Sequence, residues 1–274
     1  MRKKSKREVK DSRKFTFESK FTFKDSERIP TGIQGFDELV QGGFPKNSTI
    51  LIAGVAGTGK SIFGMQYLVN GAEKYNEKGL YVTFEQKKAE IIKQSKQFGW
   101  DVEGLEKRGK LRVMDIPINK INDRTANDLR IIIIREGIKR IVIDSLSTLV
   151  INAPLYMKIT DIPLNKFLTD KIVLSQPIIG DFFVKKFIYE FVDTLKGFNC
   201  TSLLIGESPQ NAEYLTRDTI SEFVCDGVIL INFESLGGNY SRSLIIRKMR
   251  QTKNDEDVHP VEISSKGIVV HNIE

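Results

Sequence analysis

The chain has 274 residues, of which 40% are hydrophobic and 28% charged, a composition typical of a folded globular protein. Its apolar runs are shorter than the eighteen or so residues of a membrane span, and its basic N-terminus lacks the apolar stretch of a secretory signal. We therefore expect a cytoplasmic protein without membrane association. Cys200 and Cys225 lie in apolar surroundings and there are only two histidines, which argues against a disulfide framework or a zinc cluster.

The net charge of +7 is concentrated at the N-terminus. Residues 1–28 hold eleven Lys or Arg and five Asp or Glu, so the rest of the chain carries only about +1. We interpret residues 1–28 as a flexible basic arm, which is either a solvated tail or a weak, non-specific contact for nucleic acid or an acidic partner. Within it, FTFESK and FTFKDS form a near-repeat of alternating aromatic and polar residues, which is compatible with an edge strand or a docking segment.

Strand-like and helical segments alternate from residue 29 onward. Apolar runs predict strands at 48–54, 79–85, 110–116, 139–144, 201–207 and 227–233, and helical patterns lie at 61–75, 87–100 and 181–195. The last helix has a broad apolar stripe, which we expect in the core: Phe183, Val184, Phe187, Ile188, Phe191, Val192 and Leu195. The alternation predicts one α/β domain over residues 29–274, with a mostly parallel sheet covered by helices on both faces.

The C-terminal part changes character. Two β-hairpins are predicted there, one turning at Gly237 and Gly238 and the other near Lys266 and Gly267. Between the strand that ends at residue 144 and the last long helix, residues 152–185 contain several prolines and read as an irregular insertion.

The segment GVAGTGKS fits the phosphate-loop pattern and lies between a predicted strand and a predicted helix. Residues without side chains let backbone N–H groups curl round an anion, and the positive end of the following helix points at it. In this arrangement Lys60 reaches the β- and γ-phosphates of a nucleotide, and the Ser61 hydroxyl ligates Mg²⁺. The expected nucleotide-binding residues are Gly54, Ala56, Gly57, Thr58, Gly59, Lys60, Ser61 and Ile62.

A second metal-site residue is expected at the end of another strand. In KRIVIDSLST, the apolar run brings Asp144 to the carboxyl end of a central strand, where ligands bind in open α/β sheets. An isolated Asp in this position only ends a strand. Together with a phosphate loop, it predicts the carboxylate that holds Mg²⁺ through water.

These segments together resemble the KaiC family of RecA-like P-loop ATPases, in the single-domain form found in archaea. The resemblance rests on TGIQGFDELVQGGFPKNSTILIAGVAGTGKS, YVTFEQ, IVIDSLSTL, SEFVCDGVILI, SRSLIIRKMRQT and HPVEISSKGIVV in that order, and covers residues 29–151 and 186–274. It implies a ring-shaped homo-hexamer with ATP bound between subunits.

The resemblance also implies catalytic roles. The family commonly has two glutamates after its second strand, whereas this chain has Glu85 followed by Gln86. Glu85 can polarise the attacking water, and Gln86 can orient it but cannot accept a proton. We expect slow hydrolysis, and the resemblance leaves open which of the two side chains faces the water.

Two further positions are assigned by the same resemblance. Lys248 and Arg250 match a K-x-R finger that reaches the γ-phosphate from the neighbouring subunit, although they could also be the exposed face of an edge strand. Where KaiC has its Ser–Thr phosphorylation pair, this chain has Glu222 and Phe223. Thr219 and Ser221 are near in sequence, but the missing acceptor argues against autokinase activity.

Three functions remain open at this stage. The first is a regulatory ATPase whose nucleotide state controls assembly and affinity for an unknown protein partner. The second is a DNA-acting recombinase or helicase on the same fold, and the third is an ATP-binding scaffold without hydrolysis. Glu207 and Ser208 either sense the γ-phosphate or only end a strand.

The charge distribution predicts that any nucleic-acid affinity depends on the arm. A chain that starts at Ile29 should lose its binding to single-stranded DNA, and binding by the full chain should fall at least tenfold between about 50 and 200 mM salt, because it rests on counterion release. Fluorescence anisotropy of a labelled oligonucleotide measures both effects. Binding by the truncated chain at physiological salt would instead favour the DNA-acting motor.

Overall fold

The computed structural model describes residues 27–121, 124–152, 176–209, 215–216, 218–236 and 239–272. Most of the basic arm and residues 153–175 of the expected insertion therefore lie outside the described residues. No helix in the described ranges is long and apolar enough to cross a membrane.

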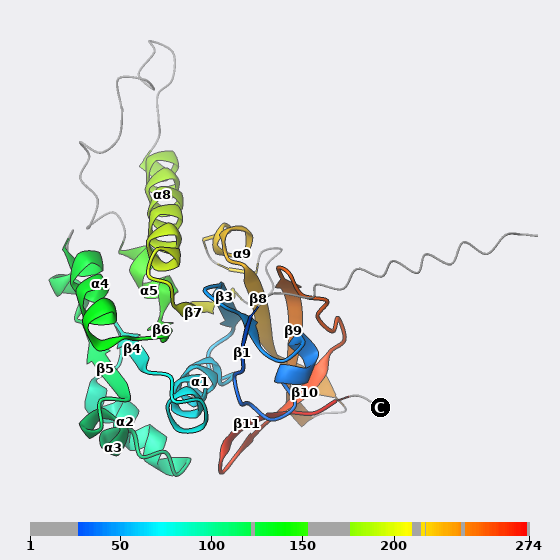
Figure 1. Cartoon of the computed structure of the whole chain (residues 1–274). Helices are drawn as coiled ribbons and strands as arrows, with labels where there is room; N and C mark the ends of the chain where they lie inside the picture. The colour runs from blue at the N-terminus through cyan, green and yellow to red at the C-terminus, as the bar shows by residue number, and fades with distance from the viewer. Residues whose placement is uncertain are drawn as a thin grey trace, which may run out of the picture.

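A nine-stranded sheet forms the centre of the molecule (Figure 1). Its order is β11-β10-β9-β8-β3-β7-β6-β4-β5, and the six strands from β8 to β5 are parallel. The strands are β3 (Thr49–Gly54), β4 (Gly79–Thr83), β5 (Leu111–Asp115), β6 (Arg140–Asp144), β7 (Thr201–Glu207), β8 (Gly227–Leu236), β9 (Asn239–Met249), β10 (His259–Ser264) and β11 (Gly267–Val270). All six predicted strands are confirmed, and a short separate pair, β1 (Arg28–Ile29) and β2 (Phe44–Pro45), precedes them.

Both predicted hairpins are present. Leu236 pairs with Asn239 across the first turn, whose two glycines lie outside the described residues, and Ser264 pairs with Gly267 across the second. Gly267 has φ +115°, a backbone conformation that favours glycine.

Helices cover both faces of the sheet because its strands are apolar on both sides. Ile50 and Ile52 of β3 point into one core cluster, and Leu51 and Ala53 point into the other. The first face carries α1 (Lys60–Lys74), α2 (Lys88–Gln97) and α3 (Val102–Lys107), and the second carries α4 (Thr125–Glu136), α5 (Leu146–Ile151) and α8 (Gln176–Lys196). Shorter elements are η1 (Asp37–Val40), η2 (Ile118–Lys120) and α9 (Ser221–Val224).

The last long helix differs from its predicted bounds. It begins at Gln176, so residues 176–185 of the expected irregular insertion are helical. The apolar stripe packs as predicted at Phe183, Ile188 and Leu195, which are buried. Phe187 and Phe191 are only partly buried and stack on one another with ring centroids 5.7 Å apart.

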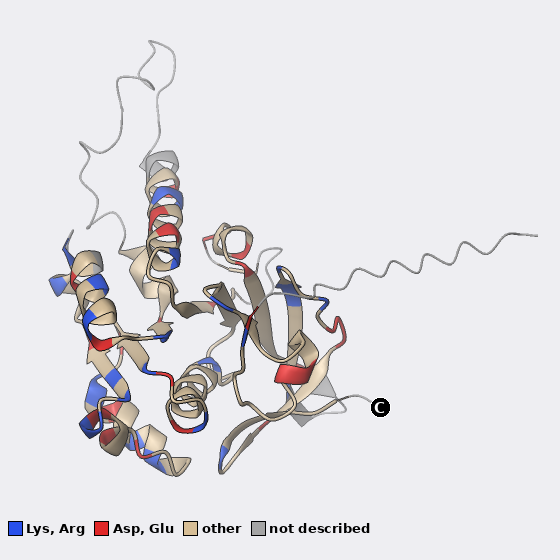
Figure 2. Ribbon diagram, in the orientation of Figure 1, with Lys and Arg blue, Asp and Glu red and all other residues tan. Residues whose placement is uncertain are grey.

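The near-neutral charge of the chain after the arm hides a local imbalance. Residues 87–140 contain fourteen Lys or Arg and eight Asp or Glu. Figure 2 shows Lys and Arg positions in blue along α2, α3 and α4, at the β5 side of the sheet. The arm is thus not the only basic part of the chain.

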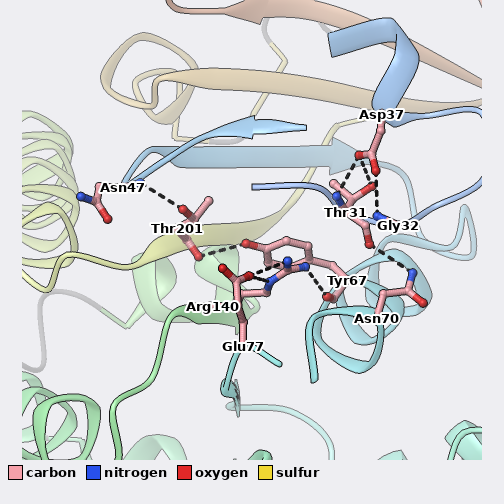
Figure 3. A network of polar contacts seen from close by, with 9 residues as sticks. All are labelled: Thr31, Gly32, Asp37, Asn47, Tyr67, Asn70, Glu77, Arg140 and Thr201. Atoms are coloured by element: carbon pink, nitrogen blue, oxygen red, sulfur yellow. Dashed lines mark hydrogen bonds and ion pairs between the residues drawn. The ribbon is translucent and has the colours of Figure 1, made fainter. Parts of the chain in front are cut away.

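A buried arginine anchors the C-terminal half of α1 to the sheet (Figure 3). The Arg140 side chain at the start of β6 is fully buried, and its Nε donates to Glu77 Oε2 at 2.6 Å. Its Nη1 donates to the Tyr67 carbonyl at 3.0 Å, and its guanidinium lies 4.7 Å from the Tyr67 ring centroid. Gly71 leaves room for it, since a Cβ there would lie 2.5 Å from Arg140 Cδ.

The same network reaches the N-terminal segment. The Asp37 carboxylate accepts hydrogen bonds from the Thr31 and Gly32 N–H groups, both at 2.8 Å, and Asn70 of α1 donates to the Thr31 carbonyl at 3.1 Å. Because α1 begins at the phosphate loop, these contacts hold the helix that carries the loop.

Removing the partner of the buried guanidinium should destabilise the fold. Glu77→Ala leaves the Arg140 charge uncompensated, and we expect it to lower the free energy of unfolding by roughly 2–4 kcal/mol. The control is Glu73→Ala at an exposed position on α1, which should change it by less than about 0.5 kcal/mol. Chemical denaturation measures both, and equal effects would contradict the role given to Arg140.

Candidate nucleotide-binding site

The loop between β3 and α1 has the backbone geometry of an anion cradle. Gly57 and Gly59 have φ of +82° and +106°, which residues with side chains rarely adopt. At Gly54 a Cβ would lie 2.1 Å from the Ile231 carbonyl oxygen. No side chain caps α1 at Gly59, so the N–H groups of its first turn face the loop.

The other loop residues place no polar side chain in this cradle, so its lining is mainly backbone. The Thr58 hydroxyl turns inward and donates to the Val55 carbonyl at 3.0 Å. Ile62 packs against the first core cluster, and Ala56 is exposed. Among the predicted loop residues, Lys60 and Ser61 therefore supply the polar side chains.

The Lys60 ammonium lies inside the loop. Its Nζ donates to the carbonyls of Gly54 and Val55, both at 2.8 Å, and the residue is only 8% exposed. Burial lowers the pKa of Lys60, while the nearby carboxylates of Glu207, Asp144 and Glu85 act in the opposite direction. One cation thus faces three carboxylates from three different strand ends.

Asp144 lies at the end of β6, where the apolar run before it was expected to place it, and it contacts Ser61. Its Oδ2 accepts a hydrogen bond from the Tyr81 hydroxyl of β4, and its carboxylate also interacts with the Ser61 hydroxyl. Burial raises the pKa of Asp144, and the two hydrogen bonds partly oppose this rise. The role of Tyr81 was not predicted from the sequence, because a tyrosine between Leu80 and Val82 reads as one more buried strand residue.

Glu85 is fixed beside Asp144 by two hydroxyl groups. Its Oε1 accepts hydrogen bonds from Ser145 Oγ at 2.7 Å and from Thr148 Oγ1, both at the start of α5. Neither partner was predicted from the sequence, although the hydroxyl-rich DSLST segment after the strand was a signal. Gln86 lines a cavity of about 30 Å³ together with Ser61 and other residues.

Glu207 ends β7, between the loop strand and the strand of Asp144. Its N–H donates to Ser147 Oγ at 2.8 Å, and its charge is the largest carboxylate influence on Lys60. The Ser208 hydroxyl instead donates to the Leu215 carbonyl at 2.7 Å. Glu207 is therefore part of this site, while the Ser208 side chain holds the following segment.

Lys248 and Arg250 do not lie near the loop of their own chain. Lys248 Nζ donates to the carbonyls of Glu222, Phe223 and Cys225 at 3.2, 3.1 and 2.7 Å. Arg250 Nη1 donates to Asp226 Oδ1 at 2.9 Å, and the other oxygen of Asp226 accepts from the Thr49 N–H. Thr49 begins β3 and the loop follows its end, so the two sites are about one strand length, roughly 17 Å, apart.

A second arginine, missed from the sequence, does contact the loop. Arg242 of β9 donates from Nη2 to the Gly57 carbonyl at 3.3 Å, and its guanidinium lies 5.1 Å from the Phe233 ring centroid. The β8–β9 hairpin therefore covers one side of the loop.

The fold and this loop define a RecA-like domain with a P-loop. The family model described as "ATPase: KaiC" matches residues 29–274, and the chain belongs to this family. It is 30% identical over 261 residues to a UPF0273 protein of Thermotoga maritima, which covers 89% of this chain and 96% of that protein. It is 29% identical over 247 residues to the circadian clock oscillator protein KaiC of Parathermosynechococcus lividus, covering 87% of this chain and 41% of that protein.

A solved structure shares the fold over most of the chain. A KaiC-like protein from Pyrococcus horikoshii matches with a TM-score of 0.74 and 30% identity, covering 90% of this chain and all of that chain. The predicted fold class and the family resemblance are confirmed.

The buried Asp144 should make the nucleotide-free protein less stable as pH rises. The pKa of Asp144 in the fold lies above 3.8, the ordinary value for an aspartate, so the folded state holds the proton more tightly than the unfolded state. The stability linked to Asp144 is present below pH 3.8 and is lost as pH rises through the higher folded pKa. Asp144→Asn removes this loss and still accepts the Tyr81 hydrogen bond, so its melting temperature should exceed that of the wild type at pH 7 but not at pH 3.5. The same difference in melting temperature between Asp144→Asn and the wild type at both pH values would contradict this.

Proposed function

We propose that the chain binds ATP with Mg²⁺ at the phosphate loop and hydrolyses it slowly. The observation that carries this proposal is the convergence of Lys60, Ser61, Asp144 and Glu85 at one edge of the sheet. The loop backbone from Ala56 to Ile62 would hold the phosphates, and Lys60 would neutralise the β- and γ-phosphate charge. The hard oxygen ligands of Ser61 and Asp144 suit Mg²⁺, which would draw charge from the phosphates and the leaving oxygen.

Glu85 is the residue we assign to the attacking water. Its carboxylate is held next to Asp144 by Ser145 and Thr148, and it lies near enough to Lys60 to influence the Lys60 pKa. Gln86 has an amide in the position of the family's second glutamate and would only orient the water. A single carboxylate at this point supports slow turnover.

We further propose that each site is completed by a neighbouring subunit of a homo-hexamer. Lys248 and Arg250 lie at the other end of the strands from their own phosphate loop, near the start of β3, which supports a role at the phosphate of another chain. ATP that bridges two subunits favours their contact by the same free energy with which the contact favours ATP. This reciprocity suits a regulatory ATPase that signals its nucleotide state to a protein partner.

The assignments of Lys60, Glu85 and Gln86 can be separated by turnover. Lys60→Ala should abolish ATP hydrolysis, Glu85→Gln should lower it about a hundredfold, and Gln86→Glu should raise it several-fold by adding a second carboxylate. Phosphate release, measured with and without Mg²⁺ and with and without single-stranded DNA, tests all three. Turnover unchanged by Lys60→Ala would refute the site, and strong stimulation by DNA would favour the motor.

Trans action can be tested by mixing two inactive variants. Lys60→Ala and Arg250→Ala should each disable every site of a ring made of that variant alone. Arg250→Ala should lower the rate of ATP hydrolysis about 10³-fold or more. After subunit exchange, some interfaces of a mixed ring pair an intact loop with an intact finger, so part of the activity should return. No recovery at any ratio, with exchange confirmed by mass spectrometry, would show that the finger does not act across subunits.

A further inference from the structure

The two edges of the large sheet differ in what covers them. At the β11 edge, the Val270 N–H donates to the Gln34 carbonyl at 3.0 Å, and Gln34 forms a bridge with Val269. At the other edge, β5 pairs with β4 and has no strand on its outer side among the described residues. An unpaired edge strand is a template for another strand.

A groove of about 580 Å³ runs along the outer side of β5. Its floor includes Leu111, Val113 and Met114, and its walls carry the ion pairs Lys88–Glu106 and Arg112–Glu136. The groove therefore offers apolar surface and charges of both signs.

The outward backbone groups of β5 can be assigned from the pairing. The Ile116 N–H points inward to the Thr83 carbonyl, so those of Leu111, Val113 and Asp115 point outward. The Val113 N–H is satisfied by Glu106 Oε1 at 3.0 Å. The Glu106 side chain, rather than a strand, therefore occupies the middle of this edge.

The sequence contains a segment with the pattern of a missing strand. Residues 15–23, FTFESKFTF, alternate with a period of two. Phe15, Phe17, Phe21 and Phe23 fall on one side, with the small Ser19 between them, and the other side carries only Thr or charged residues. It lies just before Glu27, the first described residue. One Glu and one Lys leave it without net charge, so the basic flank near β5 does not repel it.

We propose that residues 15–23 of one chain add as a strand to the β5 edge of a second copy. Main-chain hydrogen bonds to the outward groups of Leu111, Val113 and Asp115 would replace the Glu106 contact. The Lys88–Glu106 pair lies on the α2–α3 face, where it could form ion pairs with Glu18 and Lys20 of the added strand. Met114 and Ile116 are partly buried on the α4 face, where the four phenylalanines could pack against them.

The reach of the chain selects the second copy over the chain's own edge. Arg28 donates to the Gln251 carbonyl at 2.7 Å, just past the end of β9, and β9 is six strand positions from β5. Six spacings are about 29 Å, whereas the five Cα–Cα steps from Phe23 to Arg28 span at most about 18 Å. Each chain would donate one strand and accept one, which is a head-to-tail contact able to close a ring.

This inference deepens the proposed assembly, but it is tested without nucleotide. The quadruple variant F15S/F17S/F21S/F23S removes the apolar face of the segment and touches no described core residue. Val113→Pro removes the outward N–H while the inward pairing of β5 is kept. Each should raise the concentration of half-assembly roughly thirtyfold or more, measured by light scattering of the full chain.

Matched controls separate strand addition from lost packing. Val113→Ala loses packing but keeps the N–H, and T16A/T22A changes only the polar side of the segment. Both should stay within about threefold of the wild type. Lys60→Ala should assemble like the wild type here, so a failure of the proposed ATPase would not be confused with a failure of this contact.

A mixture tests the trans arrangement directly. The quadruple variant offers an edge without a strand and Val113→Pro offers a strand without an edge, so together they should form dimers at concentrations where each alone is monomeric. Hydrogen exchange of residues 111–115 should slow on assembly. Assembly of the quadruple variant at wild-type concentrations, or slow exchange at this edge in a monomer, would overturn the proposal.

Discussion

The parallel register of four neighbouring strands is the constraint on which the site depends. Gly54 pairs with Glu207, Ile205 with Asp144, and Asp144 with Thr83. The carboxyl ends of β3, β7, β6 and β4 therefore lie side by side at one end of the sheet. Side chains that are far apart in sequence thereby surround the phosphate loop. A one-residue slip of β6 would turn Asp144 to the opposite face of the sheet and remove it from Ser61.

The site concentrates charge in a place that favours neutral groups. Lys60 and Asp144 are each only 8% exposed. Burial lowers the pKa of Lys60 and raises the pKa of Asp144, which in both cases favours the neutral form. Such an arrangement stabilises the fold poorly, because desolvation opposes the attraction between the charges. It is suited to a ligand that brings its own opposite charges, as a nucleotide with a divalent cation does.

The sequence was most informative where a structure follows from local pattern. Apolar runs located the parallel strands, and the spacing of Gly54, Gly59 and Lys60 located the loop, because each depends on neighbouring residues alone. The start of α8 was misplaced because prolines and apolar residues were read as an irregular insertion. Helix α4 was missed, since its IIII run shows no clear helical period.

Contacts that depend on tertiary packing were not accessible from the sequence. Tyr81 reads as one more apolar strand residue until β4 is placed beside β6. Ser145 and Thr148 donate hydrogen bonds to Glu85, which is some sixty residues away in the sequence, so their role appears only in the folded chain. Alternation put Lys248 and Arg250 on one face, but only the fold shows that this face lies at the far end of β3.

The phosphate loop thus lies in a fixed setting. The strand register brings the carboxylates to it, and Arg140 holds the C-terminal half of α1, the helix that begins at the loop. Lys248 and Arg250 lie about one strand length away from it. Isothermal titration of ATP into the full chain, with and without Mg²⁺, tests whether the phosphate loop binds ATP together with a divalent cation. About one ATP should bind per chain, and it should bind more tightly in the presence of Mg²⁺. Absent binding, or equally tight binding without the cation, would show that the loop is not such a site.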